Sequence, residues 1–204
     1  LPLLNARNHH FDLPETPIQV IGEEDGRFDS GDYILFYGTS TEGYVNDNDS
    51  HINPYSDESF YYITAHGGPG KRVQNMVEPS GNADHVFTRF HDYKFHEKDE
   101  ENPTKLGRVW YGNRFDINRE QSYDFSFPNI VSSEPMKVII KTAAASESNT
   151  SMGVTVNGAP QNRINYSRLR SGILLSTRDF IENIPATTPD VNIKLTYNNS
   201  GNPS

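Results

Sequence analysis

The chain has 204 residues, with 18 basic and 27 acidic side chains, a net charge of −9 and no cysteine. This charge balance argues against binding to nucleic acid, which needs clustered Lys and Arg to neutralise phosphates. Without cysteine the chain has no disulfide, no thiolate metal ligand and no thiol nucleophile. Only 34% of the residues are hydrophobic, and no apolar run is long enough for a membrane-spanning helix. The 11 Phe and 11 Tyr can still supply a core.

The first pattern along the chain is an acidic loop that leads into an aromatic run, EEDGRFDSGDYILFYG. In the register of an EF-hand calcium loop, Asp25, Asp29 and Asp32 fall on positions that supply oxygen ligands. The first ligand position is then Ile21, which cannot bind a cation. We therefore favour an acidic turn for this loop, and a calcium site formed by the three aspartates is the alternative.

Aromatic runs predict strands in the first half of the chain. Tyr33–Tyr37 (YILFY) and Phe60–Thr64 (FYYIT) are rich in aromatic and β-branched residues and are bounded by turn-forming residues. Such runs are typical of strands that are buried on both faces. The stretch His85–Phe95 indicates one long strand or two interrupted ones. Between these runs, His66–Lys71 (HGGPGK) lacks the spacing of a phosphate-binding loop and predicts a Gly-Pro turn.

Strand patterns continue in the second half of the chain. Apolar and polar residues alternate in Tyr123–Phe127 and in Val191–Tyr197, as in strands with one buried face. Val138–Thr142 and Met152–Val156 are two further strands. Asn157-Gly158 follows the second of these and is a strong signal for a tight turn.

A short helix is predicted only near the end of the chain. Ser176 and Thr177 are candidate N-caps for the segment STRDFIENI, and the acidic Asp179 follows them. The overlapping run Ile173–Thr177 (ILLST) is a further strand candidate.

Many short strands separated by turn signals predict an all-β fold, with an antiparallel sandwich or jelly roll as its architecture. Residues 1–80 are expected to form a small β subdomain or the first strands of the sandwich. Residues 81–204 are expected to form the sandwich domain itself.

The segment GRVWYGNRF contains the only Trp and the densest group of aromatic and arginine residues. Side chains of this kind can stack on sugar rings or bind a protein partner. The alternative is a core Trp with arginine stems lying along the apolar surface. The sequence leaves both interpretations open. The residues concerned are Arg108, Trp110, Tyr111 and Arg114.

The other polar residues form no recognisable catalytic motif. The seven histidines match no metal-ligand spacing, and no serine lies in a GxSxG elbow. The acidic run HEKDEENPTK is typical of a solvated loop. We therefore expect no catalytic residue and, apart from the calcium alternative, no cofactor.

Three segments together point to a family: DGRFDSGDYILFYG, NPYSDESFYYIT and HEKDEENPTKLGRVWYGNRF. In this order they resemble the region ahead of the peptidase domain in gingipain-like C25 cysteine peptidases. The likeness is greatest to PorU-like sortases, the signal peptidases of the type IX secretion system in Bacteroidetes. It covers residues 13–204 and is weakest over 141–184. Family members often have Gly-Glu where this chain has Gly112-Asn113.

The resemblance implies a non-catalytic accessory β-domain of a cell-surface peptidase at the extracellular face of the outer membrane. The family's catalytic Cys and His lie in the peptidase domain, so none is expected here. The implied partners are that downstream domain, other secretion components and the C-terminal signal domains of cargo. Both ends of the sequence favour an excised piece of a longer protein. The rival function is a carbohydrate-binding jelly roll of a surface glycan-handling protein, which would use Trp110 and Tyr111.

Overall fold

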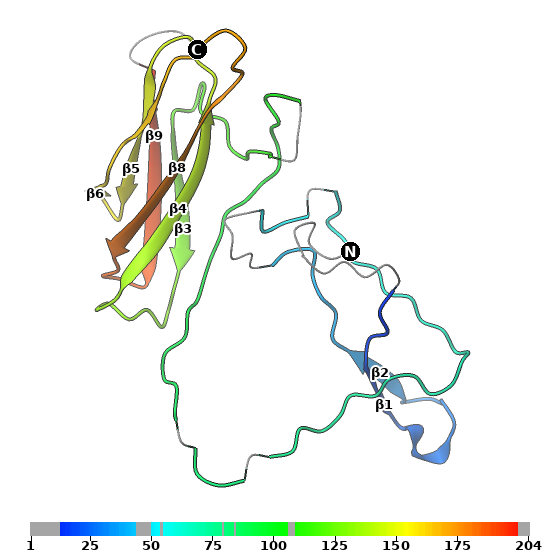
Figure 1. Ribbon diagram of the computed structural model, residues 1–204. Helices are drawn as coiled ribbons and strands as arrows, with labels where there is room; N and C mark the ends of the chain where they lie inside the picture. The colour runs from blue at the N-terminus through cyan, green and yellow to red at the C-terminus, as the bar shows by residue number, and fades with distance from the viewer. Residues whose placement is uncertain are drawn as a thin grey trace. The chain divides into compact units, whose positions relative to one another are not determined.

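The computed structural model describes residues 13–43, 50–53, 55–78, 80–83, 85–105 and 109–199 (Figure 1). Within these ranges the secondary structure consists of nine β-strands and one short 3-10 helix. The predicted all-β class is therefore confirmed. The chain divides into two units, residues 1–91 and 92–204, whereas the sequence suggests a division after residue 80.

The first unit contains a β-hairpin. Strand β1 (Ile18–Ile21) pairs antiparallel with β2 (Tyr33–Phe36), and a 3-10 turn, η1 (Glu23–Asp25), lies in the loop between them. The strand predicted at Tyr33–Tyr37 is thus present. Its predicted burial on both faces is wrong, because all four residues of β2 are exposed.

Two other strand predictions in this part of the chain are wrong. Phe60–Thr64 and His85–Phe95 lie in described parts of the chain and contain no strand. Their β-forming residues favour an extended backbone, but a strand also needs a hydrogen-bonded neighbour. On the side of β1 that faces away from β2, the hydrogen bonds go to a segment other than these two.

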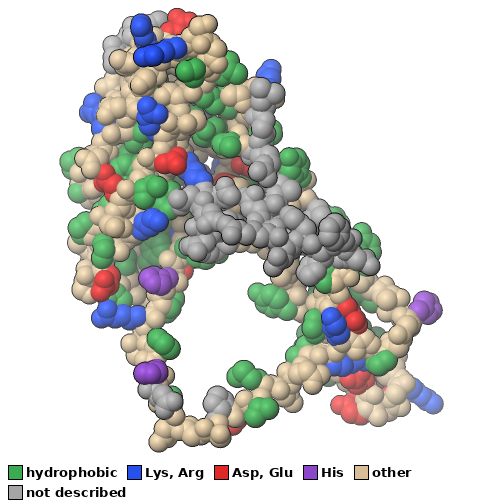
Figure 2. Space-filling model, viewed as in Figure 1, with side chains coloured by type: hydrophobic (Ala, Val, Ile, Leu, Met, Phe, Trp, Pro, Cys, Tyr) green, Lys and Arg blue, Asp and Glu red, His purple; other side chains and the backbone are tan. Residues whose placement is uncertain are grey.

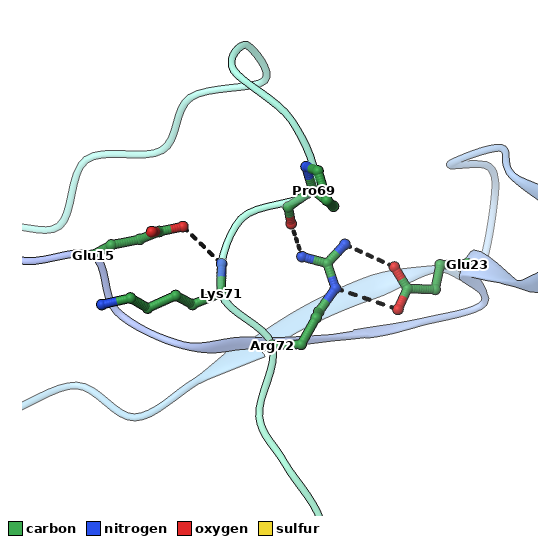
Figure 3. Close-up of polar contacts among 5 residues, drawn as sticks. All are labelled: Glu15, Glu23, Pro69, Lys71 and Arg72. Carbon is green, nitrogen blue, oxygen red and sulfur yellow. Dashed lines mark hydrogen bonds and ion pairs between the residues drawn. The ribbon is translucent and has the colours of Figure 1, made fainter.

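That segment is the end of the glycine-rich turn (Figure 3). The N–H of Ile18 donates to the Lys71 carbonyl at 3.0 Å, and the N–H of Val73 donates to the Ile18 carbonyl at 2.9 Å. The Glu15 carboxylate accepts the N–H of Lys71 at 2.7 Å. Arg72 donates to the carbonyl of Pro69. The chain bends at residues 67–69, where Gly67 and Gly68 have positive φ angles, in agreement with the predicted Gly-Pro turn. The hydrogen bonds that follow the bend hold residues 71–73 against β1.

The second unit holds two antiparallel sheets. Five strands form the larger sheet, in the order β3-β9-β5-β6 with β7 also paired to β5, and two long strands form the smaller one. The larger sheet comprises β3 (Glu120–Ser126), β5 (Thr150–Val156), β6 (Ala159–Pro160), β7 (Ile164–Tyr166) and β9 (Asp190–Asn198). The smaller sheet comprises β4 (Pro135–Ala144) and β8 (Ser176–Pro185).

The core of this unit lies between the two sheets, as expected for a sandwich. In Figure 1 the β4–β8 pair lies in front of β3, β9 and β5. Val154 is 2% exposed at the centre of this cluster. Both sheets contribute buried side chains: Val138, Ala144, Phe180 and Ile184 from the smaller one, and Met152, Val154, Val156, Ile164, Tyr166, Val191 and Leu195 from the larger one.

The helix predicted from Ser176 onward is wrong, because this segment is the ten-residue strand β8. Phe180 and Ile184 are buried while Ile181 between them is 48% exposed, which is the alternation of a strand. The N-cap signal at Ser176 and Thr177 is overridden by pairing of the whole segment with β4. The preceding strand candidate enters β8 only in its last two residues.

The other strand predictions in this unit are confirmed. In β3 the burial alternates along the strand, and Tyr123 and Phe125 pack against the core cluster. Asn157 and Gly158, with φ angles of 48° and 80°, form the two-residue turn between β5 and β6. Positive φ at both positions is what such hairpin turns require.

Candidate functional site

Two of the three aspartates of the acidic loop, Asp25 and Asp32, accept hydrogen bonds within the loop through their carboxylates, and Asp29 takes part through its backbone. The Oδ1 of Asp25 accepts the N–H of Arg27 at 2.9 Å, and the Oδ2 of Asp32 accepts the N–H of Asp29 at 2.8 Å. The N–H of Asp32 in turn donates to the Asp29 carbonyl at 3.1 Å. These are contacts of turn-forming side chains.

A neighbouring carboxylate of the loop binds an arginine. Glu23 accepts the Nη2–H of Arg72 at 2.9 Å and the Nε–H at 3.4 Å (Figure 3). In the described part of the chain, no three His, Asp or Glu side chains are grouped as a metal site would require. The contacts of the loop support the acidic-turn interpretation, and calcium binding by Asp25, Asp29 and Asp32 stays a prediction.

The aromatic and arginine segment is only partly exposed. Arg108 lies outside the described residues. Trp110 is 41% exposed, whereas Tyr111 is half-buried and its N–H and carbonyl both pair with Glu101 at 2.8 Å. Burial and then the charge of Asp179 raise the pKa of the Tyr111 hydroxyl. Arg114 is exposed and pairs with Asp116 at 3.1 Å. Trp110 is thus the ring of this set that is open to a ligand.

The structure also contains a cleft that was not predicted from the sequence. Its volume is about 560 Å3, and it lies beside β3 in the second unit. Its walls come from β3 and from two segments that precede it in the chain. The lining residues are Lys94, Phe95, His96, Asn113 and the six consecutive residues Gln121–Ser126.

Three of these side chains form a hydrogen-bonded group. The Oδ1 of Asn113 lies 3.1 Å from the Nε2 of His96 and accepts the Tyr123 hydroxyl at 3.2 Å. Because an amide oxygen only accepts, the Nε2 of His96 carries the proton in this contact. The rings of His96 and Tyr123 also touch, with centroids 4.7 Å apart. Burial raises the pKa of Tyr123.

Two further contacts fix the walls of the cleft. The Nε2 of Gln121 donates to the carbonyl of Arg114 at 2.8 Å. A Cβ placed on Gly112 would lie 3.1 Å from the Lys98 carbonyl oxygen, so the two segments approach closely at this glycine. His96 and Asn113 are 17 residues apart and meet only through this packing. The one feature of the sequence that pointed to this cleft was the position of Tyr123 on the inward face of the alternating strand.

The cleft offers hydrogen-bonding groups beside aromatic rings, which is the chemistry of a binding site. The chain has no cysteine and so no Cys nucleophile. The described residues include no helix that combines the length and the apolar character needed to cross a membrane. Comparison of the sequence with protein-family models and with curated proteins gives no match.

Proposed function

We propose that this chain is a non-catalytic accessory β-domain of a PorU-like C25 cysteine peptidase of the type IX secretion system. In this role it supports the peptidase domain and docks partners or cargo at the cell surface. The ordered set of three sequence segments supports the assignment. The sandwich fold and the absence of a thiol nucleophile from the chain agree with a supporting role.

The observation that carries the proposal is the open hairpin of the first unit. Tyr33, Ile34, Leu35 and Phe36 of β2 are 37–50% exposed, and Tyr37 after them is 83% exposed. Figure 2 shows hydrophobic side chains at the surface of the first unit as well as the second. Contiguous exposed apolar side chains mark interaction surfaces. In our proposal the peptidase domain covers this strand.

The test uses the peptidase domain that we expect the same gene to encode after residue 204. We expect this domain, supplied as a separate polypeptide, to bind the chain, and Leu35→Ser combined with Tyr37→Ser to weaken binding. Val131→Ser, which changes a 37% exposed residue of the second unit, is the control and should leave binding intact. Cleavage of a C-terminal signal peptide by the chain alone would overturn the non-catalytic assignment.

Carbohydrate binding is the second candidate, and the exposed ring of Trp110 favours it. Aromatic rings of this kind stack on the apolar faces of sugars. Calorimetry or glycan arrays distinguish the two functions. Saturable sugar binding that Trp110→Ala abolishes would support the carbohydrate-binding function. The accessory-domain function predicts no such binding, and this is the result that we expect.

A further inference from the structure

Strand β3 lies at one end of the larger sheet, so one of its edges has no neighbouring strand among the residues that the structure describes. The N–H of Tyr197 donates to the Arg119 carbonyl at 2.8 Å, and the N–H of Phe127 donates to the Pro189 carbonyl at 2.8 Å. In an antiparallel pair, every second residue directs both backbone groups to its partner. The odd-numbered residues of β3 therefore bond to β9, and the even-numbered ones direct N–H and C=O outward. The outward set is Glu120, Ser122, Asp124 and Ser126.

The cleft described above opens along this edge. Six consecutive residues of β3, Gln121–Ser126, line it. Because neighbouring side chains of a strand lie on opposite faces, a cavity on one face could not be lined by all six. Lys94, Phe95 and His96 line the same cleft. The outward backbone groups of Ser122 and Asp124 thus face a cleft.

The two sides of this edge differ in chemistry. On the inner side, Tyr123 and Phe125 provide aromatic surface, and Phe95 also lines the cleft. On the outer side, Asp124 also lines a second cleft, of about 510 Å3, together with Asp190. An added strand would therefore place alternate side chains against aromatic rings and against carboxylates.

The two carboxylates have neutral partners. Asp124 accepts the Nδ2–H of Asn192 at 2.7 Å, and Asp190 accepts the hydroxyl of Ser126 at 3.0 Å. Neither takes part in an ion pair with another described residue. Lys94 is the one Lys or Arg among the residues that line the two clefts. The negative charge on the outer side is thus open to cationic side chains.

We propose that the free edge of β3 binds an extended peptide segment of another protein as an additional strand. The segment alternates apolar with basic side chains, so that the apolar ones meet Tyr123 and Phe125 and the basic ones meet Asp124 and Asp190. Main-chain hydrogen bonds to the outward groups of β3 supply affinity, and the alternating contacts supply register and specificity. This site does not depend on the family resemblance.

The test uses the whole chain and a fluorescein-labelled peptide of alternating lysine and valine with the seven-residue length of β3. Fluorescence anisotropy measures its binding. A peptide of the same composition, with the lysines in one block and the valines in another, is the control. We expect saturable binding of the alternating peptide alone. Equal binding of both would show attraction to the acidic protein without strand pairing, and would overturn the proposal.

Two variants locate the site on β3. Ser122→Pro removes an outward N–H, and an edge strand tolerates proline where the N–H makes no ladder bond. We expect it to weaken binding about fivefold, the effect of losing one hydrogen bond. Asp124→Lys, which leaves the backbone intact, should weaken binding by charge repulsion. Glu147→Lys, on an exposed loop, is the matched control for charge. Unchanged binding in Asp124→Lys would overturn the proposal even if Ser122→Pro did not fold.

A second copy of the chain is the other occupant that an open edge could take. Light scattering over a range of protein concentrations distinguishes it. We expect a monomer whose mass is unchanged in Asp124→Lys. A dimer that this substitution dissociates would show that β3 pairs with itself, and would overturn the assignment to another protein.

Discussion

The carboxylate of Asp32 lies directly over the α-carbon of Gly22, where a Cβ would be 1.9 Å from the Oδ1 atom. Gly22 has a φ of 95°, in the region that residues with a side chain rarely adopt. The other carboxylate oxygen of Asp32 accepts the N–H of Asp29 at 2.8 Å. The acidic loop can thus bring Asp32 back to the start of the loop, just before β2, only because residue 22 is a glycine.

Gly22→Ala should therefore destabilise the hairpin of the first unit. Backbone strain costs about 1–2 kcal/mol, and displacement of Asp32 removes a hydrogen bond worth about 1 kcal/mol. Hydrogen exchange at the amides of β1 and β2 measures the effect. Gly31→Ala is the matched control, because Gly31 has a φ of 108° but open space around its α-carbon. Equal losses in the two variants would contradict the role of the Asp32 contact.

The same loop predicts how the protein responds to calcium. If its aspartates form turns, Asp32→Ala should destabilise the hairpin by about 1 kcal/mol without any metal, because the N–H of Asp29 loses its acceptor. Millimolar Ca2+ should leave the melting temperature unchanged. A calcium-dependent rise that disappears in the combined Asp25→Ala and Asp29→Ala variant would instead establish a metal site.

Two neighbouring residues of β8 test the sandwich core. Phe180 is 5% exposed and packs between the sheets, whereas Ile181 is 48% exposed on the opposite face. Phe180→Ala should cost about 3–5 kcal/mol of unfolding free energy, as truncation of a buried aromatic does. Ile181→Ala should cost less than about 1 kcal/mol, since it loses only its cross-strand contact with Ile139. Similar costs in denaturant unfolding would contradict the strand assignment of this segment.

The strands of the second unit were the part of the fold most open to prediction from sequence. In β3 and β9 each strand has one buried face, so alternation of apolar and polar residues identified both. The turn at Asn157-Gly158 was equally clear, because positive φ at both positions restricts the residue types. β8 was misassigned because its two cap-forming residues stand where a helix could begin.

Aromatic runs of the first half were harder to interpret, for a physical reason. Phe60–Thr64 has the composition of a buried strand, but composition does not specify a hydrogen-bonding neighbour. The candidate cleft was equally hidden. His96, Asn113 and Tyr123 meet through tertiary packing, and no local spacing records such a contact. The free edge of β3 follows from strand order, which alternation along a single strand does not determine.

Tyr166 predicts how stability changes at alkaline pH. Burial raises the pKa of its hydroxyl above the usual value of about 10, and the hydroxyl donates to the Thr142 Oγ1 at 2.7 Å. Between the unfolded and folded pKa values, the unfolded state releases its proton while the folded state retains it. Unfolding free energy should therefore fall as the pH rises above about 10. Denaturant unfolding at a series of pH values measures this slope.

Tyr166→Phe should make this decline shallower and cost about 1 kcal/mol at neutral pH through the lost hydrogen bond. The decline should not vanish, because burial also raises the pKa of Tyr111 and Tyr123. Tyr62→Phe, at a residue that is 80% exposed, is the control and should leave the profile unchanged. An identical slope in Tyr166→Phe and the unsubstituted protein would show that the Tyr166 hydroxyl does not hold its proton more tightly in the folded state. Because Tyr166 is 3% exposed in the core, that result would also contradict the burial of its hydroxyl.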